Sequence, residues 1–360
     1  MFKNNLFTIA FSALLLVGCE KLLPVSTSTD AAPASPVAKN DGLEKGHPEL
    51  VKAFKSLMEG CTLAGSGTTY MCKDENVKNQ LEQKEKEVGS KTALLTYCHA
   101  QEHWNRVVRQ LAALRALEVG NFWTMRNEAD PEVLECLLNF LSKAHRPVEV
   151  TLLGRVTAYV STVLGKEEYL LNAIGKNTQA KEAVYHHLWT NGRLRVFPLL
   201  EKILKENGTP RMKEVVIRGF VYGPPPSDLE HEKICELLLP AISDADLMVA
   251  ATAAYRSVFS CPEMRTQILQ TIATMLKKNR VHDMHVKALA GIADKEPERT
   301  KMIGALLTKI LANKALEPYV RSESLSTIAK LDPKMGIKLA KKYKNENHEF
   351  VRRVVENILR

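Results

Sequence analysis

The sequence lacks the residue patterns of the common nucleotide-binding and hydrolase sites. It has no glycine-rich phosphate loop, no dinucleotide-binding glycine pattern and no Ser/His/Asp set. Almost no stretch alternates between apolar and polar residues as a half-buried strand would. The apolar segment near its start is too short to span a bilayer as a permanent helix. These absences argue against a sheet-based enzyme and favour a helical, non-catalytic protein.

The start of the chain has the pattern of a secretory signal peptide. Lys3 supplies an early positive charge, and an apolar segment covers residues 6–17. This segment ends in Leu16-Val17-Gly18-Cys19, which resembles a bacterial lipobox. The resemblance implies that residues 1–18 are cleaved off and that Cys19 is acylated, with palmitate among the chains. An uncleaved apolar anchor is the alternative interpretation.

A lipid on Cys19 would place the protein on a bacterial membrane, facing the periplasm. By resemblance to enterobacterial sorting rules, Glu20 after the cysteine favours the outer over the inner membrane of a Gram-negative cell. Residues 24–46 are rich in Ser, Thr, Ala and Pro and have almost no large apolar side chains. Such a composition cannot offset the entropy of ordering the chain. We therefore predict a lipidated N-terminus and flexible tether over residues 19–46.

Short similar segments recur in the second half of the chain. Their second residues are 32, 37, 37, 34 and 31 residues apart, and five of the six are Lys or Arg. A regular period of this length is typical of stacked helical hairpins. The segments are residues 180–183, 212–215, 249–252, 286–289, 320–323 and 351–354.

These segments resemble the first helix of HEAT or HEAT-like repeats, which carries an Asp/Glu-x-x-Val-Arg-x-x-Ala signature. Residues 317–321 and 347–352 match it best, whereas Ala250 stands where a basic residue is usual. The resemblance implies a right-handed α-solenoid of stacked antiparallel hairpins. A compact, irregular helical domain is the alternative.

The spacing of apolar residues independently predicts an all-α fold. Residues 229–242, 264–275 and 302–311 carry apolar side chains at three- and four-residue intervals. We expect an N-terminal helical region over residues 47–146 and the HEAT-like repeats over residues 147–360. Consecutive prolines predict a bend or a longer loop at residues 223–227.

Cysteine usage agrees with an oxidising compartment, because six cysteines remain when Cys19 is set aside. Fifteen pairings are formally possible. We favour the sequential one, since stacked hairpins bring nearby segments together. Cys61 and Cys72, which flank a Gly/Ser/Thr loop, would close a small hairpin, whereas the other four are equally well explained as buried thiols. The favoured pairs are Cys61 with Cys72, Cys98 with Cys136, and Cys235 with Cys261.

One motif suggests metal chemistry. His99, Glu102 and His103 have the H-x-x-E-H spacing of inverzincin metalloproteases, in which two histidines on one helix face bind zinc and the glutamate polarises water. In that family the helix lies in an α/β domain, whereas this sequence shows no pattern that predicts strands. We therefore predict no metal or other cofactor, and we keep a zinc-dependent hydrolase as the alternative function.

Two other histidine pairs are weaker candidates for a metal site. His282 and His285 flank a helix start, where Asp283 is expected to cap the helix rather than to coordinate a metal. His186 and His187 are adjacent in the chain, which gives no ligand spacing.

Positive charge is concentrated near the C-terminus. Residues 271–360 contain 19 Lys and Arg against 10 Asp and Glu, and this net charge of +9 equals that of the whole chain. Eight of these side chains form what we call the C-terminal basic surface, although a solvated capping repeat would also be polar. The surface favours an acidic partner, and an extracytoplasmic address argues against nucleic acid. It consists of Lys334, Lys338, Lys341, Lys342, Lys344, Arg352, Arg353 and Arg360.

Together these patterns predict an envelope lipoprotein that is not an enzyme and that binds a protein partner along a helical-repeat surface. Besides the zinc hydrolase, a structural spacer or a quality-control factor of the periplasm remains an alternative. Neither the partner nor the binding face follows from the sequence.

Overall fold

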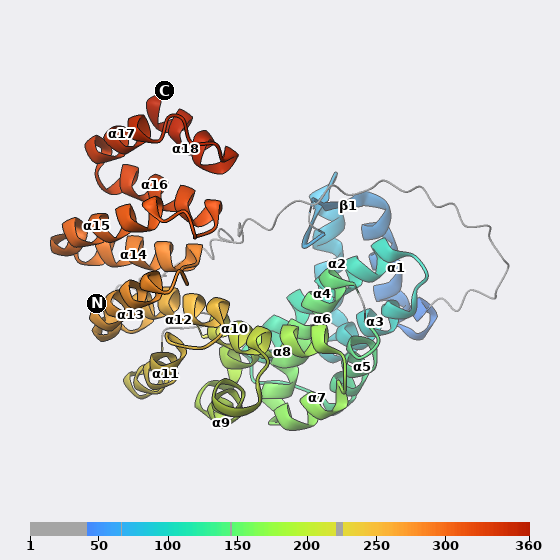
Figure 1. Ribbon diagram of the computed structural model, residues 1–360. Helices are drawn as coiled ribbons and strands as arrows, with labels where there is room; N and C mark the ends of the chain where they lie inside the picture. The colour runs from blue at the N-terminus through green and yellow to red at the C-terminus, as the bar shows by residue number, and fades with distance from the viewer. Residues whose placement is uncertain (1–41, 66, 145, 221–225) are drawn as a thin grey trace, which may run out of the picture. The chain divides into compact units, whose positions relative to one another are not determined.

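The computed structural model describes residues 42–65, 67–144, 146–220 and 226–360, and they are mostly helical (Figure 1). The described chain contains eighteen α-helices and one antiparallel two-stranded hairpin, which confirms the predicted all-α class. None of the described helices is long and apolar enough to cross a membrane. The predicted signal peptide, Cys19 and most of the predicted tether lie outside the described residues.

The elements follow one another in this order: α1 (Pro48–Gly60), β1 (Cys61–Ala64), β2 (Thr69–Cys72), α2 (Glu75–Val88), α3 (Ser90–His99), α4 (Arg106–Met125), α5 (Pro131–Leu141), α6 (Pro147–Leu164), α7 (Glu167–Ala173), α8 (Thr178–Gly192), α9 (Phe197–Lys202), α10 (Pro210–Gly219), α11 (Asp228–Ala241), α12 (Leu247–Ser260), α13 (Arg265–Lys277), α14 (Asp283–Lys295), α15 (Thr300–Ala312), α16 (Pro318–Leu331), α17 (Pro333–Lys342) and α18 (Glu349–Leu359).

The prediction that the tether extends to residue 46 is wrong. Gly42–Lys45 form a 3-10 turn that packs against α3, and the side chain of Leu43 is buried. The backbone N–H of His47 donates a hydrogen bond to Thr96 Oγ1 over 3.1 Å. The composition of the whole segment hid this turn, because one apolar side chain that reaches the core is enough to order its neighbours.

Strands β1 and β2 form the small hairpin expected at the first cysteine pair. Their register runs from Cys61 opposite Cys72 to Ala64 opposite Thr69. Gly67 in the turn has a φ of 74°, a left-handed conformation that glycine adopts without steric cost. The Cys61–Cys72 disulfide closes the base of the hairpin.

Every second helix from α4 to α18 packs against the next one in the series. Helix α6 contacts α4 and α8, α8 contacts α10, and the contacts continue through α12, α14 and α16 to α18 (Figure 1). Small residues permit close approach. A Cβ atom added at Gly154 of α6 would lie 2.5 Å from Cβ of Ala183 in α8. A larger side chain at this position would therefore force the two helices apart.

The six recurring sequence segments all lie near the starts of helices in this series. They occupy α8, α10, α12, α14, α16 and α18, while α9, α11, α13, α15 and α17 follow the first five in the chain. The three helices predicted from apolar spacing correspond to α11, α13 and α15, within two residues at each end. Helix α6, which begins at the predicted boundary at residue 147, packs against both α4 and α5.

Two of the recurring basic residues tie one unit to the next. Lys213 Nζ in α10 lies 3.0 Å from Asp244 Oδ2, just before α12. The buried Arg321 in α16 donates through Nε to the carbonyl oxygen of Leu311 and lies 2.7 Å from Glu346, just before α18. In both pairs the acid belongs to the turn that precedes the next helix of the series.

The other two cysteine pairs also form disulfides. Cys98 of α3 is bonded to Cys136 of α5, and Cys235 of α11 is bonded to Cys261 at the end of α12. Each bond joins helices that already pack against each other. The structure therefore contains the sequential pairing that the sequence favoured.

The proline-rich interruption lies largely outside the described residues, which resume at Pro226. Ser227 then begins α11 with a capping box. Its side chain accepts a hydrogen bond from the N–H of Glu230, and the Glu230 side chain accepts one from the N–H of Ser227.

Candidate functional site

The H-x-x-E-H stretch does not form one continuous α-helix. Helix α3 ends at His99, Ala100–Glu102 form a 3-10 turn, and His103 is extended with a ψ of 137°. The prediction that His99 and His103 share one helix face is therefore wrong. The chain starts a new helix here, because Asn105 Oδ1 accepts a hydrogen bond from the N–H of Val107.

The side chains of this stretch have other partners. Glu102 lies 2.6 Å from Nζ of Lys45, on the turn that precedes α1. His103 is largely buried, and its Nδ1 accepts a hydrogen bond from the N–H of Asn105 over 3.0 Å. In the described part of the chain, these side chains do not converge on a common metal position.

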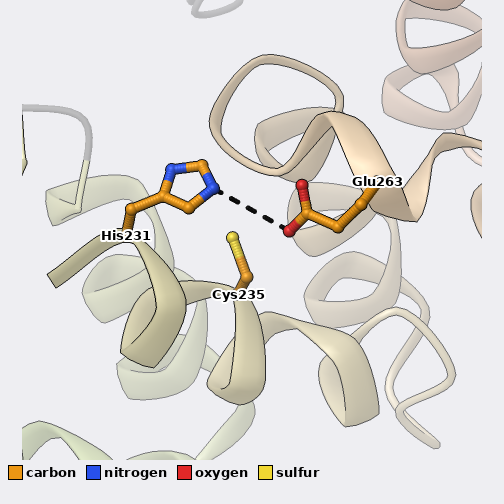
Figure 2. Close-up of side chains that lie close together, drawn as sticks. All are labelled: His231, Cys235 and Glu263. Atoms are coloured by element: carbon orange, nitrogen blue, oxygen red, sulfur yellow. Dashed lines mark ion pairs between the residues drawn. The ribbon is translucent and has the colours of Figure 1, made fainter. Parts of the chain in front are cut away.

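A different group of side chains has the composition of a metal site (Figure 2). His231 and Cys235 lie one turn apart on α11, and Glu263 comes from the 3-10 turn between α12 and α13. Their ligand atoms all lie within 4.8 Å of one another, and His231 Nε2 is 3.8 Å from Glu263 Oε1. Among the residues that the structure describes, no other three His, Cys, Asp or Glu side chains meet this criterion.

The group is open to solvent on one side. The side chains of His231 and Glu263 are 39% and 58% exposed, whereas Cys235 is buried. Cys235 Sγ lies 3.6 Å from the carbonyl oxygen of Ser260, the last residue of α12. An ion could therefore enter past the imidazole and the carboxylate and meet the sulfur at the inner end.

In the structure the sulfur of Cys235 is engaged by its bond to the fully buried Cys261. The thiolate is the form of cysteine that binds metals, and a disulfide sulfur carries no such charge. In the oxidised protein the group is therefore a disulfide flanked by a histidine and a glutamate.

Sequence reasoning missed this group, although its signal was present. His231 and Cys235 are four residues apart, so a helix at this place puts both on one face. Glu263 follows Cys261 by two residues, so the pairing of Cys235 with Cys261 already brings the carboxylate to the histidine. Interpreting Cys235 as a disulfide partner or as a buried thiol left out the histidine and the glutamate beside the pair.

The residue that caps α14 is the neighbour of the one expected. His282, not Asp283, is the N-cap, and its Nδ1 accepts a hydrogen bond from the N–H of Met284. The N–H of His282 in turn donates to Nδ1 of His285. Asp283 instead forms an ion pair with Lys287, whose Nζ lies 2.9 Å from its Oδ2. The prediction that Asp283 caps the helix was wrong, because the imidazole of His282 already accepts a hydrogen bond from an N–H group of the first turn.

The histidines of the two weaker motifs are buried, as His187 and His285 are, or half-buried, as His186 and His282 are. Burial, together with His282, lowers the pKa of His285 to about 3. Burial, together with four nearby arginines, lowers the pKa of His186 to about 4. His186 Nδ1 lies 3.3 Å from His187 Nε2. At neutral pH the rings of His285 and His186 are therefore uncharged.

All eight side chains of the C-terminal basic surface are exposed, and they lie on or directly after α17 and α18. These two helices pack against each other. Arg353 lies 2.7 Å from Glu349 on the same helix. For the other seven, no carboxylate in the described residues comes within ion-pair distance. The structure therefore gathers a positive charge that is largely uncompensated by the chain itself.

Comparison of the chain with protein-family models finds no match, and comparison with curated protein sequences finds none either.

Proposed function

We propose that this chain is a lipid-anchored scaffold of the bacterial envelope, which binds a protein partner through a right-handed solenoid of HEAT-like repeats. The observation that carries the proposal is the ordered packing of every second helix from α6 to α18, with recurring sequence segments near the helix starts from α8 onward. Repeats that stack on like neighbours present an extended surface, and such surfaces serve binding.

The cysteine pairs support an extracytoplasmic address. Disulfides persist in secreted and periplasmic proteins and are rare in the cytosol. The three disulfides are consistent with the signal peptide pattern and with acylation at Cys19. In this proposal the lipid holds the protein to the outer membrane of a Gram-negative cell, and the tether lets the helical part reach its partner.

The C-terminal basic surface is the electrostatic part of the proposed interface. Its like charges on adjacent helices repel one another, and folding alone does not require that arrangement. An acidic face on the partner would relieve the repulsion. Attraction between such surfaces mainly accelerates association and fixes orientation, and salt weakens it.

Crosslinking in intact cells, followed by purification of the protein, tests the proposal. The wild-type protein should capture one dominant envelope protein. Reversing Lys341, Lys342 and Lys344 to Glu should reduce this capture and should flatten the dependence of the affinity on salt concentration. Helix content should not change, since exposed substitutions usually alter stability by only about 0.5 kcal/mol.

A matched control carries the same charge change elsewhere. Lys52, Lys55 and Lys73 are also exposed, and their reversal to Glu should leave capture unchanged. If both triple variants bind the captured partner like wild type, the C-terminal basic surface is only a solvated cap. If no envelope protein is captured at all, the scaffold proposal itself is wrong.

A further inference from the structure

The residues around the Cys235–Cys261 disulfide can do more than hold two helices together. Reduction of this bond produces two thiols next to an imidazole and a carboxylate. We propose that the reduced protein binds Zn²⁺ at His231, Cys235, Cys261 and Glu263, so that the same place alternates between a disulfide and a zinc site.

The set of donor atoms fits zinc. Zn²⁺ in proteins is bound tetrahedrally by cysteine sulfur, histidine nitrogen and carboxylate oxygen. The two sulfurs, one imidazole nitrogen and one carboxylate oxygen together fill four positions. Thiolates also select zinc over the hard cations Mg²⁺ and Ca²⁺, which prefer oxygen ligands.

The distances require only small movements. With zinc–sulfur bonds of about 2.3 Å, two sulfurs in a tetrahedral site lie about 3.8 Å apart. The sulfurs must therefore separate somewhat after the bond breaks. The ligand atoms of His231, Cys235 and Glu263 already lie within 4.8 Å of one another. The exposed side chains of His231 and Glu263 are free to close on the ion by side-chain rotation.

The backbone around the site favours this exchange. Cys235 lies within α11, and Cys261 and Glu263 follow α12 directly, while the two helices pack against each other. Either the disulfide or the ion therefore joins the same two elements. Zinc would preserve the link between α11 and α12 under conditions that break the covalent bond.

The chemistry of the exchange is simple. A phosphine reductant donates two electrons to the disulfide, takes an oxygen atom from water, and leaves the two hydrogens of that water on the sulfurs. Zinc then displaces both protons as the thiols bind as thiolates. In the reverse direction an added small-molecule disulfide, such as oxidised glutathione, accepts two electrons and becomes two thiolates, while the Cys235–Cys261 bond re-forms and the ion is released.

The test uses the purified full-length protein in detergent, with tris(2-carboxyethyl)phosphine as reductant and Zn²⁺ as the probe. Competition with a chromophoric chelator measures the affinity, and Co²⁺ substitution reports sulfur ligation through its thiolate charge-transfer absorption. We expect one Zn²⁺ per reduced chain and none at this site in the oxidised chain. His231→Ala and Glu263→Gln should each weaken binding by about tenfold or more, since even supporting residues of metal sites contribute that much.

Matched variants decide the assignment. Cys235→Ser with Cys261→Ser should abolish binding, whereas Cys98→Ser with Cys136→Ser should leave it unchanged. Equal zinc binding by both double variants, or no binding by the reduced wild type, would overturn the proposal. If reduction lowers the helical circular dichroism signal, zinc should restore it in the wild type but not in His231→Ala. Failure of zinc to restore the signal in the wild type also counts against the site.

Discussion

The guanidinium group of Arg115 and the carboxylate of Glu85 form a buried ion pair that joins α4 to α2. The two side chains are only 2% and 8% exposed. Arg115 Nε donates to Glu85 Oε1 over 2.9 Å, and the hydroxyl of Tyr97 donates to the same oxygen over 2.5 Å. Arg115 also donates to the hydroxyl of Tyr70, on strand β2. One arginine therefore connects the hairpin, α2 and α4 in the N-terminal region.

Breaking this pair should be costly. Arg115→Met leaves the charge of Glu85 buried without a counter-ion, and we expect a loss of about 3–5 kcal/mol in the free energy of unfolding. Arg353→Met serves as the control, since it breaks the exposed pair with Glu349 and should cost less than about 1 kcal/mol. Urea unfolding followed by circular dichroism measures both. Similar losses in the two variants would show that the buried Arg115–Glu85 pair contributes no more to the free energy of unfolding than the exposed pair does.

The first disulfide should stabilise the protein less than the second. The Cys61–Cys72 bond closes a separation of 11 residues, and its removal by double alanine substitution should cost about 2–3 kcal/mol. The Cys98–Cys136 bond closes a separation of 38 residues. Because this loop is longer, loop entropy alone should make the removal of this bond about 1 kcal/mol more costly than the removal of the first. Denaturant unfolding of the two double variants gives the comparison. Peptide mapping of the non-reduced wild type checks the premise, which fails if Cys61 and Cys72 carry free thiols.

Stability should fall as the solution becomes acidic, in part through His285. Its pKa of about 3 in the folded protein is below the value of about 6.5 in an unfolded chain. Between these two pH values the unfolded state binds a proton at this histidine and the folded state does not. The stabilisation is therefore present above pH 6.5 and is lost as the pH falls toward 3. Between pH 7 and 5 this residue should account for a loss of about 2 kcal/mol.

His285→Gln tests this loss, because glutamine does not titrate and can still accept the hydrogen bond from the N–H of His282. Urea titrations at pH 7 and pH 5 should show a smaller decline in the variant than in the wild type. The control His348→Asn removes an exposed histidine but keeps a cap acceptor for α18. An unchanged decline in His285→Gln would mean that this ring becomes protonated without unfolding.

The proposed acylation of Cys19 can be tested by substitution. Acylation needs the sulfur, so Cys19→Ser should abolish lipid labelling and leave a soluble or unprocessed product. The double variant Cys61→Ser with Cys72→Ser should still take up lipid, since it retains Cys19. Metabolic labelling with a fatty acid, followed by membrane fractionation, distinguishes the variants. Full membrane recovery of a cleaved Cys19→Ser product without label would contradict the lipobox interpretation.

Patterns that extend over many residues predicted the helical fold well. Apolar spacing located α11, α13 and α15, because each buries one face along its whole length. The regular spacing of the basic residues correctly indicated helices that pack on one another, since equivalent residues of similar units contact equivalent neighbours. The order of the cysteines predicted the pairs for the same reason.

The predictions that were wrong concerned features that depend on a single residue. The new helix start at Asn105 and the cap at His282 are set by individual hydrogen bonds, which the N–H groups of Val107 and Met284 donate to Asn105 Oδ1 and His282 Nδ1. Composition could not reveal that Leu43 reaches the core. The cluster of His231, Cys235 and Glu263 was missed because its members come from two elements, and its signal emerges only when the Cys235–Cys261 pairing is combined with the packing of α11 on α12.

The positions of the disulfides also determine how the chain would respond to a pulling force between its ends. The three bonds bypass separations of 11, 38 and 26 residues, so about 75 residues, or roughly 260 Å of extended chain, cannot be drawn out while the bonds persist. Among the described residues, no covalent bridge lies beyond Cys261. The three stretches that the bonds enclose, residues 61–72, 98–136 and 235–261, would keep their length under load, whereas α13 to α18, which include the C-terminal basic surface, would lengthen one unit at a time.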